Sequence, residues 1–169
     1  VMGSNGSVVP FFLGKKKEGA LPITDINMTR FNISLNDGVR MVLYALENAW
    51  GGELFVPKIP SYRITDLAKA IGPDCEYPII GLRPGEKIHE EMINSSDSYN
   101  TYDLGKYYVI LPQLTRWSID EYKQHFNAKL VEQGFSYTSG ANGKFLSVEE
   151  LKRLVSEHAV SAGQCSLGE

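Results

Sequence analysis

One short stretch, residues 83–86, combines a cation and a carboxylate with a backbone turn. Pro84 fixes φ at the second position of a turn and Gly85 accepts the positive φ of the third, as in a type II turn. Arg83 and Glu86 then occupy the first and fourth positions, where both side chains can leave the turn close together. A guanidinium suits phosphate oxygens, and a carboxylate can accept hydrogen bonds from paired sugar hydroxyls. The stretch is therefore a candidate nucleotide-sugar site.

The same turn also has a simpler interpretation as an exposed surface feature. Pro-Gly turns flanked by charge are common, and a surface Arg–Glu pair contributes under about 1 kcal/mol. Its position favours a site, because residues 77–82 form an apolar run of strand character and Ile88, Met92 and Ile93 have helical spacing. A turn between a strand and a helix lies where an open α/β sheet collects its ligands.

A second cation, Arg30, lies in a predicted strand over residues 28–33, whose side chains alternate between two faces. A strand arginine is usually a solvent-facing edge residue, but together with Arg83 it could supply a second phosphate ligand. Further upstream, Ser7 is placed to cap a predicted helix over residues 8–17. Backbone N–H groups before such a helix attract anions, although any helix start has them.

The remaining elements follow from periodicity and capping signals. A helix over residues 35–48 begins after Ser34, and we expect it to be a scaffold whose apolar positions face the core. Those positions are Val39, Val42, Leu43 and Leu46. A strand over residues 53–57, a helix capped by Thr65 and the run at 77–82 then follow in the order of a βαβ crossover, which predicts a parallel sheet.

The second half of the chain reads as a polar, irregular segment over residues 94–105, a strand over residues 107–111 and two further helices. Ser118 and Ser147 each precede a glutamate by three residues, which is the spacing of a capping box. We place the domain at residues 1–158 and expect residues 159–169 to be a frayed tail.

Composition bounds the class of protein. The 169 residues are 43% hydrophobic with a net charge of −3, which gives no electrostatic reason to expect nucleic acid or an anionic membrane as a partner. No apolar run approaches the roughly 20 residues of a membrane span, and no secretory signal opens the chain. Cys75 and Cys165 suit free thiols in the cytoplasm. The three histidines have no metal-ligand spacing, so we expect no metal.

Signals for catalysis are missing from the sequence. No complete G-x-G-x-x-G loop follows a strand. Tyr102 and Lys106 have the spacing of a Tyr-x-x-x-Lys pair, but they lie late in the chain with a glycine between them, so we interpret them as coincidence. Composition and spacing alone therefore predict an anion-binding α/β domain and nothing sharper.

Four separated segments together resemble one family in their order and spacing: residues 1–10, 23–31, 51–61 and 83–91. The chain is similar to the C-terminal half of the inverting UDP-N-acetylglucosamine 4,6-dehydratases, which are extended short-chain dehydrogenases/reductases. The match runs from Val1 to about His158. The resemblance implies an α/β fold in which this chain is the substrate-binding part and the N-terminal Rossmann half is missing.

The resemblance also implies a reaction on bound NADP. The sugar is oxidised at carbon four, water is lost across carbons five and six, and the hydride returns to carbon six with inversion at carbon five. The product, a 4-keto-6-deoxy UDP-sugar, supplies pseudaminic acid or a related surface glycan. The family's catalytic residues belong to the N-terminal half, so no catalytic residue is assigned here. The complete enzyme is expected to be a cytoplasmic homo-oligomer.

Binding positions can be assigned from the same resemblance. Val1 and Met2 match the segment beside the nicotinamide end of the cofactor. The substrate positions are Ser4, Asn5, Gly6, Ser7, Arg30, Arg83 and Glu86. Among them Arg30 and Arg83 match the pair that contacts the UDP diphosphate, and Glu86 matches the acid that holds the ribose. Asn5 stands where the family's loop is expected to have an arginine, which implies weaker substrate binding or a shifted sugar specificity.

Two alternatives to this interpretation remain open from the sequence. In the first, the chain is a binding module that holds nucleotide sugars without chemistry. In the second, it is a fragment that needs its missing half to fold. In related reductases the strand matching residues 54–56 joins the sheet of the cofactor domain, so here it would present an unpaired edge. The fragment interpretation therefore predicts a marginally stable, aggregation-prone chain.

Overall fold

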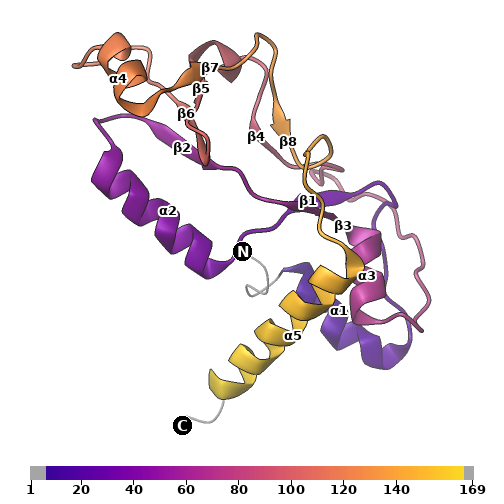
Figure 1. Cartoon of the computed structure of the whole chain (residues 1–169). Coiled ribbons are helices and arrows are strands. Elements are labelled where there is room, and N and C mark those ends of the chain that lie inside the picture. Colours follow the sequence, from indigo (N-terminus) through magenta and orange to yellow (C-terminus); the bar gives the residue numbers. More distant parts are fainter. Residues whose placement is uncertain (1–6, 166–169) are drawn as a thin grey trace.

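The computed structural model describes residues 7–165, and the side chains of residues 7–157. Figure 1 shows two groups of elements: helices α1, α3 and α5 gather at one end, and a small sheet with α4 lies at the other. The helices are α1 Val8–Lys15, α2 Leu35–Asn48, α3 Ile64–Ile71, α4 Ile119–Phe126 and α5 Val148–Cys165, with short 3₁₀ turns at Lys16–Glu18 and Asp97–Asn100. The strands are β1 Thr29–Phe31, β2 Leu54–Pro57, β3 Ser61–Arg63, β4 Glu91–Ile93, β5 Thr101–Asp103, β6 Tyr107–Ile110, β7 Lys129–Leu130 and β8 Tyr137–Thr138.

All the paired strands described are antiparallel. β1 pairs with β3, β4 pairs with β8, and a four-stranded sheet has the order β2-β6-β5-β7. The predicted parallel βαβ sheet is therefore wrong. After α3 the chain does not return beside β2. The segment that contains Pro78 makes isolated parallel bridges to residues 20–23 instead, and a proline in such a segment removes one donor from any continuous ladder.

The main hydrophobic core lies among α1, α3 and α5. Its fully buried members include Phe12, Leu21, Leu67 and Leu151. The same core includes Val9 of α1, Met28 just before β1 and Tyr62 of β3, so it joins α1 to both strands. Two smaller clusters lie on opposite faces of the four-stranded sheet, one around Val56 and the other around Tyr122.

Helix α2 has the predicted bounds and cap, but its apolar face is not part of the core. Ser34 Oγ accepts a hydrogen bond from the Asp37 backbone N–H at 3.1 Å, as expected. The residues predicted to face the core are 49% to 76% exposed: Val39, Val42, Leu43 and Leu46. Periodicity identifies which face of a helix is apolar, but not whether a partner covers that face.

The contacts of α2 explain this exposure. The helix packs along β2 through the Tyr44 ring, which lies 5.7 Å from the Phe55 ring and 4.5 Å from the Tyr107 ring. Figure 1 shows α2 standing apart from the other helices, next to β2. β2 is itself an edge strand of its sheet. The apolar face of α2 is thus exposed, and the neighbouring strand β2 has one edge without a partner strand among the described residues.

The other boundaries show what capping signals predict and what they miss. The helices predicted after Ser118 and Ser147 are confirmed, and each serine Oγ accepts a backbone N–H three residues later. α3 begins at Ile64, one residue before the predicted cap Thr65. The predicted boundary after His158 falls within α5, which continues to Cys165.

Two other segments differ from their predictions. Residues 91–93, predicted as helical from their spacing, form β4 because they pair with β8. Residues 94–105, predicted as irregular, contain the 3₁₀ turn Asp97–Asn100 and β5.

Candidate functional site

A cleft of about 660 Å³ lies between the start of α1, strands β1 and β3, and the loop that carries residues 80–86. Ser7, Arg30, Arg83 and Glu86, all predicted as binding residues, line it together. The loop reaches this cleft because Ile80 N–H donates to the Ile23 carbonyl at 2.9 Å and Thr29 N–H donates to the Ile88 carbonyl at 3.0 Å. A cleft of this size falls in the usual range for small-ligand sites, about 300–1,000 Å³.

Arg30 enters the cleft from β1 and is held by backbone carbonyls. Its side chain is 23% exposed, so it is not a free edge residue. Nη1 donates to the Thr29 carbonyl at 2.7 Å and to the Ile88 carbonyl at 3.1 Å. Nε lies 3.4 Å from Oε1 of Glu90. The guanidinium therefore has a fixed direction before any ligand binds.

Arg83 and Glu86 lie on the predicted turn, which the structure confirms. Glu86 N–H donates to the Arg83 carbonyl at 3.0 Å, and Gly85 has φ of +85°. In addition, Oε2 of Glu86 accepts the Arg83 backbone N–H at 2.9 Å. The Arg83 guanidinium makes no hydrogen bond or ion pair within the described part of the chain, so one cation of the cleft is fixed and the other is exposed.

Ser7 is the N-cap of α1 by position but not by bonding. Its side chain makes no capping hydrogen bond, and its buried Oγ has no partner among the described residues. A capping hydroxyl bonds the backbone N–H of the second or third helical residue, and the third residue of α1 is Pro10, which has no N–H. Ser7 is among the residues that line the cleft, although its Oγ itself is buried. The spacing of Ser7 and Pro10 carries this signal in the sequence, and the sequence analysis missed it.

Tyr62 is a cleft residue that the sequence analysis also missed. It lies in β3 opposite Arg30 in β1 and is 6% exposed. Burial raises the pKa of Tyr62 to about 12, although the nearby charge of Arg30 acts in the opposite direction. Tyr62 therefore stays a neutral phenol at physiological pH. Its strand is only three residues long and showed no alternation, so its place was not predictable.

The other predicted binding positions lie outside the described residues: Val1, Met2, Ser4, Asn5 and Gly6. Within residues 7–157, whose side chains are described, no group of three or more acidic, histidine or cysteine side chains is arranged to hold a metal. No helix in the described part is long and apolar enough to cross a membrane.

Comparison with known proteins identifies the family. The profile of one family, described as polysaccharide biosynthesis protein, matches residues 1–112. The chain belongs to the polysaccharide biosynthesis protein family. This match and the relatives below confirm the relationship inferred from the four sequence segments, and the helices and strands of the structure confirm the mixed α/β class.

The relatives of this chain include proteins that are named as enzymes. It is 48% identical over 163 residues to a UDP-N-acetylglucosamine 4,6-dehydratase (inverting) from Campylobacter jejuni, which covers 92% of the chain and 48% of the relative. It is 41% identical over 162 residues to a UDP-glucose 4-epimerase from Rickettsia canadensis, over 92% of the chain and 46% of the relative. The chain thus spans about half the length of the curated relatives that it matches.

A solved structure has the same fold. The X-ray structure of Pen from Bacillus thuringiensis superposes with a TM-score of 0.75 at 32% sequence identity. The match covers 94% of this chain and 48% of that one. The fold described here is therefore shared with about half of that protein.

Proposed function

We propose that the chain is the UDP-sugar-binding part of an inverting UDP-N-acetylglucosamine 4,6-dehydratase, a lyase that supplies a 4-keto-6-deoxy UDP-sugar for pseudaminic acid or a related surface glycan. One observation carries the proposal: Arg30 and the turn that carries Arg83 and Glu86, two segments far apart in sequence, line a single cleft. The C. jejuni relative, at 48% identity, supports the choice of reaction.

In this proposal the diphosphate lies between the two guanidinium groups. Arg30 offers a fixed cation and Arg83 a cation that can move toward the ligand, and charge-assisted bonds to phosphate are the stronger kind of hydrogen bond. Glu86 uses Oε2 to hold the turn, so Oε1 is the oxygen that would accept the ribose hydroxyls. Ser7 Oγ supplies a further polar contact on the wall formed by α1.

The proposed cofactor is NADP, which would accept and return the hydride of the reaction. The described residues fit this group only in part. Cofactor pyrophosphate is usually bound by a glycine-rich loop at a helix start, and no G-x-G-x-x-G loop follows a strand in residues 7–165. Val1 and Met2, the positions assigned beside the nicotinamide, stay predictions. We therefore propose that most contacts to NADP come from a Rossmann half outside this chain.

The proposed Rossmann half has a surface on which to pack. The exposed apolar face of α2 and the edge of β2 adjoin each other, and both features require a partner if they are to be covered. Such a partner would also complete the catalytic site. We further propose that the complete enzyme is a homo-oligomer in the cytoplasm, a compartment where the free Cys75 thiol stays reduced.

A UDP-glucose 4-epimerase is the second candidate. The R. canadensis relative, at 41% identity, favours it, and the same cleft suits either substrate because both carry UDP. The two reactions differ in their products. The complete enzyme, incubated with UDP-N-acetylglucosamine, is expected to form a 4-keto-6-deoxy sugar detectable by its loss of water in mass spectrometry. A product of unchanged mass epimerised at carbon four would favour the epimerase.

Calorimetric titration of the chain with UDP tests the site itself. We expect UDP to bind and Arg83→Ala to raise Kd at least about tenfold, since a charge-assisted contact contributes about 1.5–3 kcal/mol. Arg116→Ala is the matched control, because Arg116 is also an exposed arginine but lies in the segment before α4, away from the cleft. No heat of binding with UDP, or equal losses for both variants, would exclude the cleft as the nucleotide site. A chain that binds UDP while the complete enzyme turns over no sugar would indicate the inert binding module.

A further inference from the structure

A cluster of polar side chains is built around Thr29, the residue before Arg30, from two buried hydroxyls and the exposed His89. Thr29 is 4% exposed and Ser139 is 0% exposed, and their hydroxyl oxygens are 2.7 Å apart. Thr29 Oγ1 also lies 2.8 Å from Nδ1 of His89. Among the residues described as lining the cleft, none belongs to this set. We call Thr29, His89 and Ser139 the Thr29 cluster.

The Thr29 cluster is bonded to the groups that hold Arg30. Ser139 Oγ donates to the Thr29 carbonyl at 3.2 Å, and this carbonyl is an acceptor of Arg30 Nη1. Ser139 Oγ also accepts the Glu90 backbone N–H at 2.9 Å, and the Glu90 carboxylate faces Arg30 Nε. The third acceptor, the Ile88 carbonyl, is joined to the Thr29 N–H. Each partner of Arg30 is therefore connected to Thr29 or Ser139.

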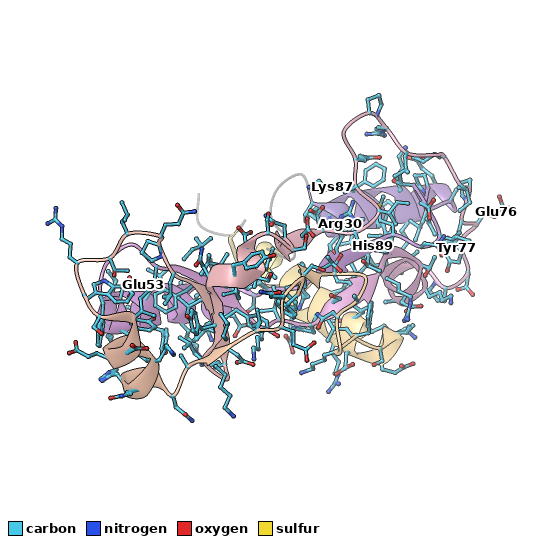
Figure 2. The ribbon with its side chains drawn as sticks, turned by 90° about the horizontal axis from the view of Figure 1, so that it is seen from above. Arg30, Glu53, Glu76, Tyr77, Lys87 and His89 are labelled. Atoms are coloured by element: carbon cyan, nitrogen blue, oxygen red, sulfur yellow. The ribbon has the colours of Figure 1, made fainter. Side chains whose placement is uncertain are left out.

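A distant part of the chain supplies this support. Ser139 follows β8, and its backbone N–H donates to the Glu90 carbonyl at 2.8 Å, which continues the pairing of β8 with β4. The next residue, Gly140, leaves room for the His89 ring, since a Cβ there would lie 2.6 Å from Nδ1. Figure 2 labels Arg30 and His89 in the same region of the molecule, and His89 is tied to Thr29, the residue before Arg30.

We propose that Thr29, His89 and Ser139 are positioning residues that fix the Arg30 guanidinium toward the phosphate-binding part of the cleft. An arginine that is already held in its binding direction loses less side-chain entropy when a ligand binds. The Thr29 cluster would therefore raise the affinity for the ligand without touching it. The ligand in this inference comes from the proposed nucleotide-sugar function, whereas the positioning of Arg30 does not depend on it.

The test compares Thr29→Val, which removes the hydroxyl at nearly constant shape, with Thr29→Ser, which keeps it. Both are titrated with UDP and with uridine, using the full 169-residue chain. We expect Thr29→Val to raise Kd for UDP about tenfold and to leave Kd for uridine unchanged, because only the diphosphate contacts Arg30. Thr29→Ser is expected to restore UDP binding. A general loss of structure would instead weaken the binding of both UDP and uridine.

Thr101→Val is the matched structural control. Thr101 is also 0% exposed, and its Oγ1 donates to the Asp97 carbonyl at 2.7 Å, far from the cleft. This variant is expected to lower the melting temperature while UDP binding stays unchanged. If Thr101→Val weakens UDP binding as much as Thr29→Val, or if Thr29→Val binds UDP like the unmodified chain, the positioning role is refuted.

A second measurement reports on Arg30 without any ligand. The Nε–Hε proton of Arg30, followed by NMR in a ¹⁵N-labelled chain, is expected to exchange with water faster in Thr29→Val and in Gly140→Ala than in Thr101→Val. Unchanged exchange would overturn the inference even if UDP binding fell. If the unmodified chain binds no UDP, the proposed function fails, and this exchange comparison still decides whether the Thr29 cluster positions Arg30.

Discussion

Removing each arginine of the cleft separately should have different effects on stability and similar effects on binding. Arg30 is largely buried and donates to two backbone carbonyls, whereas the side chain of Arg83 is exposed and makes no hydrogen bond or ion pair within the described residues. Arg30→Ala therefore removes one of two donors from each carbonyl, since Ser139 Oγ still donates to the Thr29 carbonyl and the Thr29 N–H to the Ile88 carbonyl. It also removes the partner of the Glu90 carboxylate. Arg83→Ala removes nothing from the folded structure of the chain.

The expected changes in stability and in UDP affinity follow from these contacts. Hydrogen bonds to a charged group contribute about 1.5–3 kcal/mol, and both carbonyls keep another donor, so we expect Arg30→Ala to lower the free energy of unfolding by about 1–3 kcal/mol. In a chain of this size about 1 kcal/mol corresponds to a change of about 2–4 °C in melting temperature. Arg83→Ala should leave the melting temperature unchanged. For UDP, loss of either charge-assisted contact should raise Kd by about 10-fold to 100-fold.

Thermal melts followed by circular dichroism, paired with calorimetric UDP titrations, measure both quantities on the same samples. Arg30→Lys is a useful third variant, because lysine keeps the charge but lacks the planar fork that reaches both carbonyls, and it should be destabilised like Arg30→Ala. The reasoning would be refuted if Arg30→Ala and Arg83→Ala melted at the same temperature, or if Arg30→Ala bound UDP as well as the unmodified chain.

Four further predictions follow from single features of the structure. Ser7→Ala should weaken UDP binding yet leave thermal stability unchanged or slightly higher, because it removes a buried hydroxyl without a described partner; a lower melting temperature would contradict this. Glu86→Gln should weaken binding less than Glu86→Ala, because the amide oxygen can still accept the Arg83 N–H, and its readout is the loss of preference for UDP over deoxyuridine diphosphate in competition titrations. Leu46→Lys should leave the melting temperature unchanged and reduce aggregation in light scattering, since Leu46 is 76% exposed, whereas a clear drop in stability would show that α2 is buried after all. Stability should fall as pH rises from about 10 toward 12, by up to about 1.4 kcal/mol per pH unit from Tyr62, because burial raises the pKa of Tyr62 to about 12 and the unfolded chain loses that proton first; Tyr62→Phe should flatten this part of a melting-temperature profile.

Local signals in the sequence predicted local structure well. The capping serines at positions 34, 118 and 147 placed the starts of three helices correctly, because a cap is decided by residues within one turn. The turn at residues 83–86 followed from Pro84 and Gly85 for the same reason. Strand pairing was not predictable in this way. It depends on which distant segments meet, and β4, β5 and β3 are each three residues long and show little alternation.

The sequence predicted the charged residues of the candidate site, but not the groups that hold Arg30 in place. Arg30, Arg83 and Glu86 were identified by type and spacing, and the cleft contains them all. The carbonyls that hold Arg30 and the hydroxyl of Ser139 were not identified, because backbone groups leave no trace in a sequence and Ser139 lies 110 residues from Thr29. For α2 the helix was predicted correctly, but its apolar face was wrongly expected to be buried in the core.

The loop that carries Arg83 is tied down at both ends, and its tip bonds chiefly to itself. Changes of sequence at this tip should therefore alter ligand preference with little penalty to folding, whereas changes at Arg30 disturb a network that spans two sheets. Mutational libraries aimed at new nucleotide specificities would do best to vary the tip and keep the strand constant. Natural divergence among proteins of this shape is expected to have followed the same course.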